Sequence, residues 1–386
     1  MHLDYSPAQQ RFRADVRAWM EAHVPREPLI TLECEEGYRQ HVVWERTLAS
    51  GGWSMVTWPT AFGGRGADLI EWLIFEEEYW RAGAPLRANQ NGIFLLAPTI
   101  MEHGSEAQKA RFLPPMARGE TIWAQAWSEP AAGSDLAAIS ARAIRDGDHY
   151  ILSGQKTWSS RAAFADWGFG LFRTDPGSSR HRGLSFILFD LASPGITRRP
   201  IRQFHGHPGF AELFFDDVRV PVANRIAGEG DGWTVAMATA GFERGLMLRS
   251  PARFQATAAQ LVALLRTHRA AASPAMREAV VQAWMDAQAY TYNTYAVVAR
   301  IMAGGRIGAE ASLNKIFWSE LDRAMHRCAM SLLGACAELR RLGDAANCRT
   351  NRWLEGYIFS LAGPIYAGSN EIQRNIVAEL LLGMPR

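Results

Sequence analysis

The chain has 386 residues, of which 48% are hydrophobic and 21% charged, and its formal net charge is +2 at pH 7. This length and composition predict a soluble globular protein of two or three domains. Arginine carries almost all of the positive charge, and no basic tail or lysine-rich block is present. We therefore expect no nucleic-acid partner.

The N-terminus lacks a cationic start followed by an apolar run, so we expect no signal or transit peptide. The longest apolar stretches, such as Leu380–Leu382, are far too short to span a bilayer. The four cysteines form no Cys-x-x-Cys pair, and His205-Gly206-His207 lacks further ligands at metal spacing. These features favour a cytoplasmic protein with reduced thiols, no metal site and no membrane attachment.

The first 120 residues predict a helical domain. Ser6-Pro7 is typical of a helix start, and apolar residues follow it at helical spacing: Phe12, Val16, Trp19 and Met20. A loop rich in glycine and proline covers residues 58–66. Further helices are expected at 69–81 and 107–118.

From residue 121 to residue 228 the pattern changes to short strands between Gly, Asp and Pro turns. Strands are expected at 123–127, 150–152, 168–172, 184–189 and 212–218. Because no helix separates them, the pattern favours a barrel or sandwich over a doubly wound sheet, and we predict a β barrel. The glycines of Gly228-x-Gly230-x-Gly232 lack the spacing of a dinucleotide loop and predict a flexible approach to a helix.

Residues 229–386 are again helical in pattern, with helices expected at 233–265, 274–302 and 308–342 and a last one starting near Ser369-Asn370-Glu371. The predicted fold class is therefore α+β with several domains. An N-terminal helical domain spans 1–120, a middle β-barrel domain spans 121–228, and a C-terminal helical bundle domain spans 229–386.

Three segments carry a family resemblance. The stretch 365–374, Ile-Tyr-Ala-Gly-Ser-Asn-Glu-Ile-Gln-Arg, resembles the C-terminal signature of the acyl-CoA dehydrogenases, flavoenzymes that desaturate acyl-CoA thioesters. The stretches 125–136 and 154–160 are similar to the family segments that face the flavin and the substrate thioester. The resemblance spans the whole chain and implies a bound FAD.

The resemblance also implies which residues contact FAD. By position, Ser128 and Ser160 hydrogen-bond the edge of the flavin ring, and Trp158 packs beside it. Hydroxyl and backbone N–H groups supply fixed dipoles where negative charge develops on reduction. Two residues at the start of the last helix match contacts to the pyrophosphate and ribose side of the cofactor. The full set of expected contacts is Gln125, Trp127, Ser128, Trp158, Ser159, Ser160, Ser369 and Glu371.

Many family members carry the catalytic base, a glutamate, directly after the signature tyrosine, where this chain has Ala367. A methyl group cannot accept a proton. Branches that act on branched or long acyl chains instead place the base in an x-Glu-Arg-x segment, which Glu243 and Arg244 match. We therefore predict that Glu243 is the base, against the alternative of a solvated surface pair. The backbone N–H of residue 367 can still polarise the thioester carbonyl.

The expected substrate contacts are Ser134, Arg244, Tyr366, Ala367 and Gly368. The resemblance implies an acyl-CoA dehydrogenase of lipid metabolism that forms a dimer or tetramer, homomeric or heteromeric. Its substrate is an acyl-CoA, with bulky, branched or ring-bearing acyl groups favoured, and its electrons pass to an electron-transfer flavoprotein or similar acceptor.

Two family segments are altered in this chain. The Arg-x-x-Phe-Gly segment is missing, because the stretch after the predicted base Glu243 reads Arg253-Phe254-Gln255. The Gln-x-x-Gly-Gly segment is degraded at 331–335. The adenine end of FAD is therefore held differently or by a non-identical partner subunit. Two alternatives stay open: a flavin-dependent monooxygenase or oxidase of the same fold, and a half-site subunit of a heteromeric dehydrogenase.

Overall fold

The computed structural model describes residues 4–244, 247–305, 307–339 and 345–385. The chain divides into two compact units. The helical unit comprises Met1–Val16, Leu69–Ala82 and Arg244–Arg386, and the sheet unit comprises Arg17–Asp68 and Gly83–Glu243. Two helices, α1 (Pro7–His23) and α6 (Gly232–Arg244), each contain a boundary between the units.

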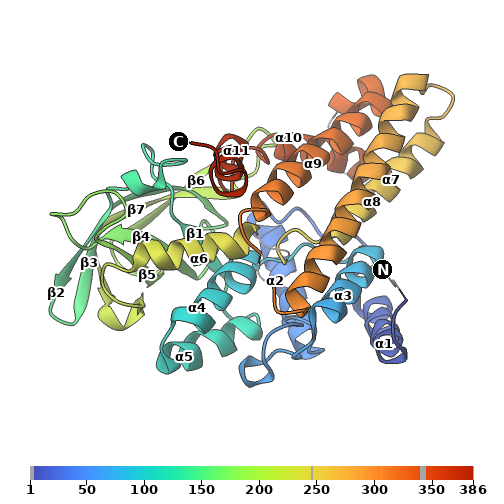
Figure 1. Cartoon of the computed structure of the whole chain (residues 1–386). Helices are drawn as coiled ribbons and strands as arrows, with labels where there is room; N and C mark the ends of the chain where they lie inside the picture. The colour runs from blue at the N-terminus through green and yellow to red at the C-terminus, as the bar shows by residue number, and fades with distance from the viewer. Residues whose placement is uncertain (1–3, 245–246, 306, 340–344, 386) are drawn as a thin grey trace. The chain divides into compact units, whose positions relative to one another are not determined.

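The helical unit packs its long helices around one apolar core. Neighbours α7, α8 and α9 lie side by side (Figure 1), and buried residues such as Phe254, Tyr290 and Trp318 fill the space between them. The helices of this unit are α3 (Leu69–Arg81), α7 (Pro251–Thr267), α8 (Pro274–Met302), α9 (Ala311–Leu333), α10 (Ala345–Ser360) and α11 (Asn370–Ile376), with short turns at Gly334–Glu338 and Val377–Leu381.

Two predicted helices end earlier than expected. The single helix predicted at 233–265 is two helices, because Ser250 caps α7 by accepting a hydrogen bond from the N–H of Ala252 and Pro251 starts its first turn. Helix α9 stops at Leu333 because Gly334 adopts a left-handed φ of 56°. The predicted end at residue 342 lies outside the described residues.

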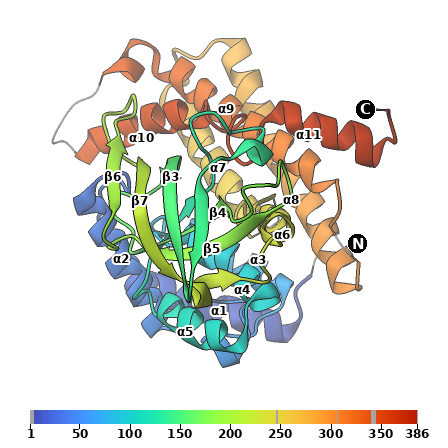
Figure 2. The same cartoon turned by 90° about the vertical axis from the view of Figure 1, so that its left-hand side faces the viewer.

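The sheet unit contains one eight-stranded sheet in the order β6-β7-β3-β2-β4-β5-β8, and β1 pairs with β4. Figure 2 faces this sheet and shows β6, β7 and β3 next to one another. The strands are β1 (Trp123–Ala126), β2 (Arg142–Asp146), β3 (His149–Ser160), β4 (Trp167–Arg173), β5 (Leu184–Asp190), β6 (Ile196–Ile201), β7 (Phe210–Pro221) and β8 (Arg225–Ile226). Its helices are α2 (Glu35–Ser50), α4 (Ala97–His103), α5 (Glu106–Ala117) and most of α6, with short turns at Thr60–Phe62, Asn91–Leu96, Leu136–Ala138 and Val222–Asn224.

The prediction of a β barrel is wrong, because the sheet is open. Its end strands β6 and β8 do not pair with each other among the described strands. Strands β2 and β4 meet at one residue pair only, Arg142 with Arg173, so the two halves of the sheet diverge. A barrel requires a complete ring of paired strands, and β8, with two residues, offers almost no edge to complete one.

The sheet core is aromatic. Phe172, Phe189 and Phe215 meet edge to face in three pairs, with ring centroids 5.1 to 6.0 Å apart. Each ring is almost completely buried. This packing leaves the end of β3 and the segment after β1, where the predicted cofactor contacts lie, on a rigid support. No helix in the described part of the chain is long and apolar enough to cross a bilayer.

Candidate functional site

A buried ion pair joins the two predicted flavin-facing segments. The Lys156 side chain is fully buried on β3, and its ammonium donates to Glu129 Oε1 at 2.8 Å. The same ammonium donates to the carbonyls of Trp127 at 3.3 Å and Leu171 at 2.6 Å. All three hydrogens of the ammonium therefore have acceptors, so the charge is compensated where water cannot reach it. The backbone N–H of Thr157 adds a bond to the Ser128 carbonyl at 2.8 Å.

The Glu129 carboxylate is equally well satisfied. Its second oxygen accepts from the backbone N–H of Ser140 at 2.7 Å, and Ala141 donates to the first oxygen at 2.9 Å. Burial alone would raise the pKa of Glu129, but the Lys156 ammonium and these N–H donors together hold it below its usual range. The Glu129 carboxylate therefore stays ionised at neutral pH, and the bonds of Lys156 to Glu129 and Trp127 fix the segment 127–129 against β3.

A bulge in β3 turns Trp158 outward. Lys156 pairs with Leu213 and Ser159 pairs with Ala211, so two residues of β3 face one residue of β7. Trp158 takes a left-handed φ of 56°, and 59% of its surface is exposed. Its ring stands edge-on to Phe210 at 5.9 Å. One face of the indole ring is therefore exposed beside the sheet and forms a flat wall against which another planar ring can stack.

Two buried donors next to this wall have no partner in the described structure. Both the hydroxyl of Ser159 and the indole N–H of Trp127 are shielded from solvent without a hydrogen bond. A buried polar group without a partner is costly, so a ligand that accepts these bonds is favoured. Gln125, Ser128 and Ser160 are half-buried in the same segments. The residues therefore fit the edge of a flavin, whereas Ser134 lies exposed in the turn that follows.

The signature segment of the helical unit forms a tight turn. Ala367 and Gly368 both have left-handed φ values, 56° and 74°. An alanine in this region is strained by about 1–2 kcal/mol, so neighbouring contacts must hold it there. No described residue accepts a hydrogen bond from the N–H of Ala367. That N–H remains available to a ligand oxygen, and Tyr366 directly precedes it.

A buried polar network supplies the contacts that hold the turn. Asn370 is 1% exposed, and its carbonyl oxygen accepts from the Lys315 ammonium at 2.8 Å and from the Ser319 hydroxyl at 3.2 Å. Its amide nitrogen donates to Glu320 at 3.0 Å. Gln373 donates to the Gly368 carbonyl at 3.3 Å. The turn is thereby tied to α9 and to the first residues of α11.

The two remaining cofactor predictions lie at the start of α11. The Ser369 hydroxyl caps this helix by accepting from the N–H of Ile372 at 3.3 Å, and Glu371 is exposed and forms an ion pair with Arg374 at 3.2 Å. Both positions are compatible with a ligand at the helix start, although the Ser369 hydroxyl already has a protein partner.

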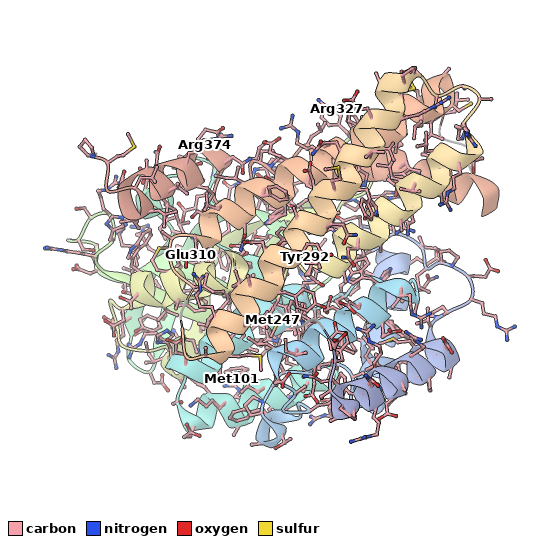
Figure 3. The ribbon with its side chains drawn as sticks, turned by 45° about the vertical axis from the view of Figure 1, so that its right-hand side comes forward. Met101, Met247, Tyr292, Glu310, Arg327 and Arg374 are labelled. Carbon is pink, nitrogen blue, oxygen red and sulfur yellow. The ribbon has the colours of Figure 1, made fainter. Side chains whose placement is uncertain are left out.

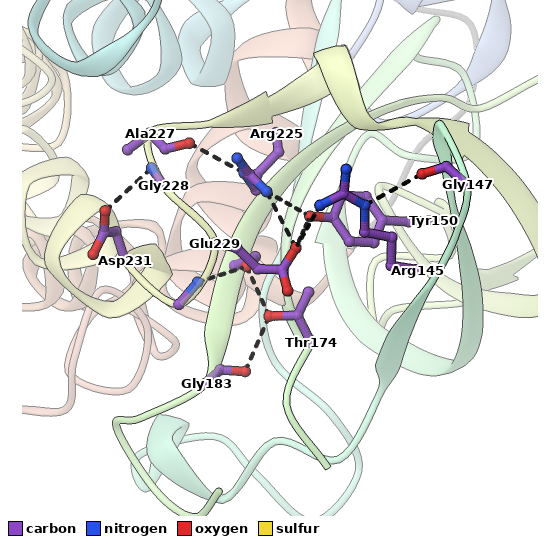
Figure 4. A network of polar contacts seen from close by, with 12 residues as sticks. Arg145, Gly147, Tyr150, Thr174, Gly183, Arg225, Ala227, Gly228, Glu229 and Asp231 are labelled. Carbon is purple, nitrogen blue, oxygen red and sulfur yellow. Dashed lines mark hydrogen bonds and ion pairs between the residues drawn. The ribbon is translucent and has the colours of Figure 1, made fainter. Parts of the chain in front are cut away.

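Helix α6 carries Glu243 near its C-terminal end and begins from a loop that is bonded to the sheet (Figure 4). In this loop, Glu229 accepts hydrogen bonds from the Tyr150 hydroxyl at 2.5 Å and from Arg225 at 3.2 Å. The backbone N–H of Gly230 donates to the Ser185 hydroxyl at 3.2 Å. The glycine-rich segment 228–232 leads into α6, as predicted, and these bonds hold it against the sheet.

The middle of α6 is held by a second contact. The hydroxyls of Thr239 and of Thr99 on α4 lie 2.8 Å apart, and both side chains are completely buried. Glu243 follows one turn after Thr239 and is half-buried. The Arg244 side chain lies outside the described residues. Glu243 belongs to the sheet unit and Ala367 to the helical unit, so their joint role stays a prediction.

Sequence reasoning missed three residues that hold these segments together: Lys156, Lys315 and Asn370. The chain has only three lysines, and two of them are fully buried. In a chain that otherwise uses arginine for positive charge, the rarity of lysine was the one available signal, although it does not separate buried Lys156 and Lys315 from Lys109.

Replacing Lys156 with Met leaves the buried Glu129 carboxylate without its cation. We expect a loss of about 3–5 kcal/mol in the free energy of unfolding, measured by urea denaturation. The control is Lys109→Met, which removes an exposed pair with Glu106 and should cost less than about 1 kcal/mol. Equal losses in the two variants would contradict the role of the Lys156–Glu129 pair.

The same pair makes stability depend on pH. Because the folded pKa of Glu129 is depressed, the contribution of the Lys156–Glu129 pair to stability is present above the unfolded pKa of the carboxyl. It is lost as pH falls through the folded pKa.

Comparison with known proteins agrees with the geometry of both units. Family models for the N-terminal, middle and C-terminal domains of acyl-CoA dehydrogenase match residues 6–120, 124–218 and 230–382. Acyl-CoA dehydrogenase IpdE1 of Mycobacterium tuberculosis is 37% identical over 384 residues, which cover 98% of each chain. Acyl-CoA dehydrogenase FadE26 of the same organism is 31% identical over 409 residues, covering 100% of this chain and 99% of the relative.

Solved structures give the same result. The Tcur3481-Tcur3483 steroid ACAD superimposes with a TM-score of 0.87 at 28% identity, and the alignment covers 100% of both chains. The ChsE4-ChsE5 complex from Mycobacterium tuberculosis gives a TM-score of 0.84 at 30% identity, with the same coverage. The architecture is that of the family, with helical N- and C-terminal domains and a sheet-rich middle domain. The chain therefore belongs to the acyl-CoA dehydrogenase family of flavoprotein oxidoreductases.

Proposed function

We propose that this chain is an FAD-dependent acyl-CoA dehydrogenase in which Glu243, and not residue 367, removes the α-proton of the thioester. The observation that carries the proposal is the turn at Ala367. Its side chain cannot act as a base, but its N–H has no acceptor among the described residues and its left-handed conformation is fixed by buried contacts. The turn keeps the carbonyl-polarising donor and lacks the carboxylate.

In this proposal the sheet unit binds FAD through the open face of Trp158 and the donors of Trp127, Ser128, Ser159 and Ser160. When bound, FAD supplies the acceptor for the hydride that leaves the β-carbon of the acyl group. Gln125 supports the same wall, and Ser369 and Glu371 contact the phosphate and ribose side at the start of α11. Electrons then pass to an electron-transfer flavoprotein or a similar acceptor.

The substrate is an acyl-CoA thioester. Tyr366, Ala367 and Gly368 surround its carbonyl, and Ser134 and Arg244 contact its remaining parts. Polarisation of the carbonyl by the Ala367 N–H makes the α-hydrogen acidic enough for a carboxylate to remove. Glu243 is half-buried near the end of α6, and a positioned carboxylate of this kind is a suitable general base for the α-proton. The name of a structural neighbour, a steroid ACAD, supports a bulky or ring-bearing acyl group.

The cofactor proposal predicts that purified protein carries FAD and that Trp158→Ala weakens its binding. Truncation of a large aromatic wall is expected to cost about 1–3 kcal/mol in FAD affinity. Titration of the deflavinated protein, followed by flavin fluorescence, measures this loss. Phe204→Ala is the matched control, because this aromatic of the sheet unit is 99% exposed. A protein that takes up no FAD, alone or with a partner chain, contradicts the proposal.

The assembly is proposed to be a dimer or tetramer of this chain, with or without a second related chain. Helix α8 exposes an apolar face that includes Val281, Trp284, Met285 and Tyr292, each about half exposed. Tyr292 is labelled in Figure 3. Light scattering is expected to show an oligomer, and Trp284→Glu with Met285→Glu should dissociate it because charges are excluded from an interface core. A flavin-loaded, active monomer would refute this assembly. The names of two structural neighbours, each a pair of chains, support the heteromeric form.

The assignment of the base predicts that Glu243→Gln slows reduction of bound flavin by ~10²–10⁴-fold, because loss of a positioned general base has effects of this size. FAD binding should be unchanged, since the amide keeps the shape of the carboxylate. Stopped-flow absorbance under anaerobic conditions, with the best thioester of a panel, measures the rate.

Glu102→Gln, which alters an exposed glutamate elsewhere in the sheet unit, is the control and should keep the wild-type rate. Ala367→Glu alone should bring no gain in rate. If Glu243→Gln retains more than about half of the wild-type rate, where a positioned base predicts a loss of at least ~10²-fold, Glu243 is not the base. The half-site or monooxygenase alternatives would then be favoured.

A further inference from the structure

Arg249 lies on an aromatic pair beside the signature turn. Its guanidinium carbon is 4.7 Å from the ring centroid of Trp318 and 5.6 Å from that of Tyr366. The two rings are stacked, with centroids 6.0 Å apart. The hydroxyl of buried Tyr290 donates to the Arg249 carbonyl at 3.0 Å, which fixes the backbone at this position. All four residues belong to the helical unit.

The charge of Arg249 has no counter-ion among the described residues. The two carboxylates on the adjacent α9 are engaged elsewhere, Asp322 with Arg253 at 3.6 Å and Glu320 with Arg323 at 3.0 Å. Within the described part of the chain, the guanidinium donates one hydrogen bond, to the carbonyl of Leu248. Its Nε–H is buried and has no partner among the same residues.

This arrangement is unfavourable for the protein alone. A buried N–H without an acceptor destabilises the folded state, and stacking on aromatic rings offsets only part of that cost. A second cation stands on the same aromatic pair, since the Lys315 ammonium is 6.0 Å from the Trp318 ring centroid. At the same time, Ala367 removes the carboxylate that many family members place directly after the tyrosine. Arg249 and Lys315 therefore place two positive charges on the aromatic pair of Trp318 and Tyr366.

We propose that Arg249 recognises a carboxylate on the acyl group of the substrate, so that the preferred substrate is the mono-CoA thioester of a dicarboxylic acid. This inference rests on the proposed function, which places Tyr366 and Ala367 against the thioester. A carboxylate satisfies the Nε–H and a terminal N–H together in a two-point contact, and planar guanidinium groups favour this geometry. Stacking on Trp318 holds the guanidinium plane in place for it.

The acyl group and the phosphates of coenzyme A are two possible sources of such an oxyanion. Arg249 contacts the ring of Tyr366, the residue directly before the N–H that is proposed to bind the thioester carbonyl. The anion therefore lies close to the acyl chain, whereas the phosphates are separated from the carbonyl by the long pantetheine arm. We assign the acyl carboxylate, and thioesters of 3′-dephospho-coenzyme A test the other source.

The experiment uses the flavin-loaded protein and pairs of thioesters whose acyl groups differ only at the far end, carboxylate against methyl. The pairs are built on linear skeletons of increasing length and on a cyclohexane skeleton. Calorimetry measures affinity, and anaerobic flavin reduction measures turnover. The wild-type protein should bind the carboxylate member of its best pair about 10–100-fold more tightly, as expected for a charge-assisted two-point contact.

Arg249→Gln should abolish this preference while the methyl-ended thioester binds and reacts as before. Arg249→Lys keeps the charge without the planar fork and should retain only part of the preference. Arg327→Gln is the control: it removes one positive charge from exposed Arg327, on the same helix as Trp318, and should change nothing (Figure 3). Melting temperatures confirm that each variant is folded.

Each of three results overturns the inference. They are the absence of a carboxylate preference at any chain length, a preference that survives Arg249→Gln, and a preference that disappears with thioesters of 3′-dephospho-coenzyme A. Failure of the proposed function gives a different result, in which no thioester reduces the flavin. Calorimetry still tests Arg249 in that case, because it compares the two members of each pair without turnover.

Discussion

Two buried ammonium groups hold the two segments from which the proposed site is built. Lys156 ties the segment after β1 to β3 and β4 by bonds to Glu129 and to two carbonyls. Lys315 ties the start of α11 to α9 through Asn370. A buried charge is tolerated only when its hydrogens are satisfied, so each lysine imposes one arrangement on the groups around it. The exposed face of Trp158 and the left-handed turn at Ala367 depend on these arrangements.

The change at position 367 explains several features together. The family architecture normally supplies a carboxylate after the tyrosine, and this chain keeps the turn, the N–H and the buried support without it. Removing that carboxylate leaves Arg249 and Lys315 with less negative charge nearby. In the proposed function, a base carried by α6 and an anionic group on the substrate are separate responses to this single substitution. The bonds of Glu229 and Thr239 give α6 the rigidity that a positioned base needs.

Much of the fold could be predicted from local sequence. The start of α1 at Pro7 and the cap of α11 at Ser369 follow from residues adjacent in the chain, and so do the positions of β1, β4 and β5 and parts of β3 and β7. Strands β2, β6 and β8 were not predicted. The break at Ser250-Pro251 was also encoded locally, but the alanine-rich pattern on both sides concealed it. The open sheet could not be predicted in this way, because closure depends on whether the end strands β6 and β8 pair, and local sequence patterns do not specify which strands pair.

The candidate site likewise contains residues that local sequence could predict and residues that it could not. Family motifs pointed to Ser128, Trp158 and Ala367, but nothing adjacent to Lys156 indicated that its charge is buried, because its acceptors come from two other segments. Arg249 belongs to no motif, and its significance appears only where the fold brings it onto Trp318 and Tyr366. Long-range electrostatic and cation–π contacts of this kind are properties of the tertiary structure, and local patterns do not encode them.

The central claim is that a chain with alanine at position 367 is a competent acyl-CoA dehydrogenase. Anaerobic titration of the flavin-loaded protein with a panel of acyl-CoA thioesters, with the product identified by mass spectrometry, tests this claim most directly. We expect at least one thioester to bleach the flavin and to be recovered two hydrogens lighter, as the trans-2-enoyl thioester. Bound flavin that no thioester bleaches, in the protein alone or combined with a second related chain, would show that the chain is not a competent dehydrogenase.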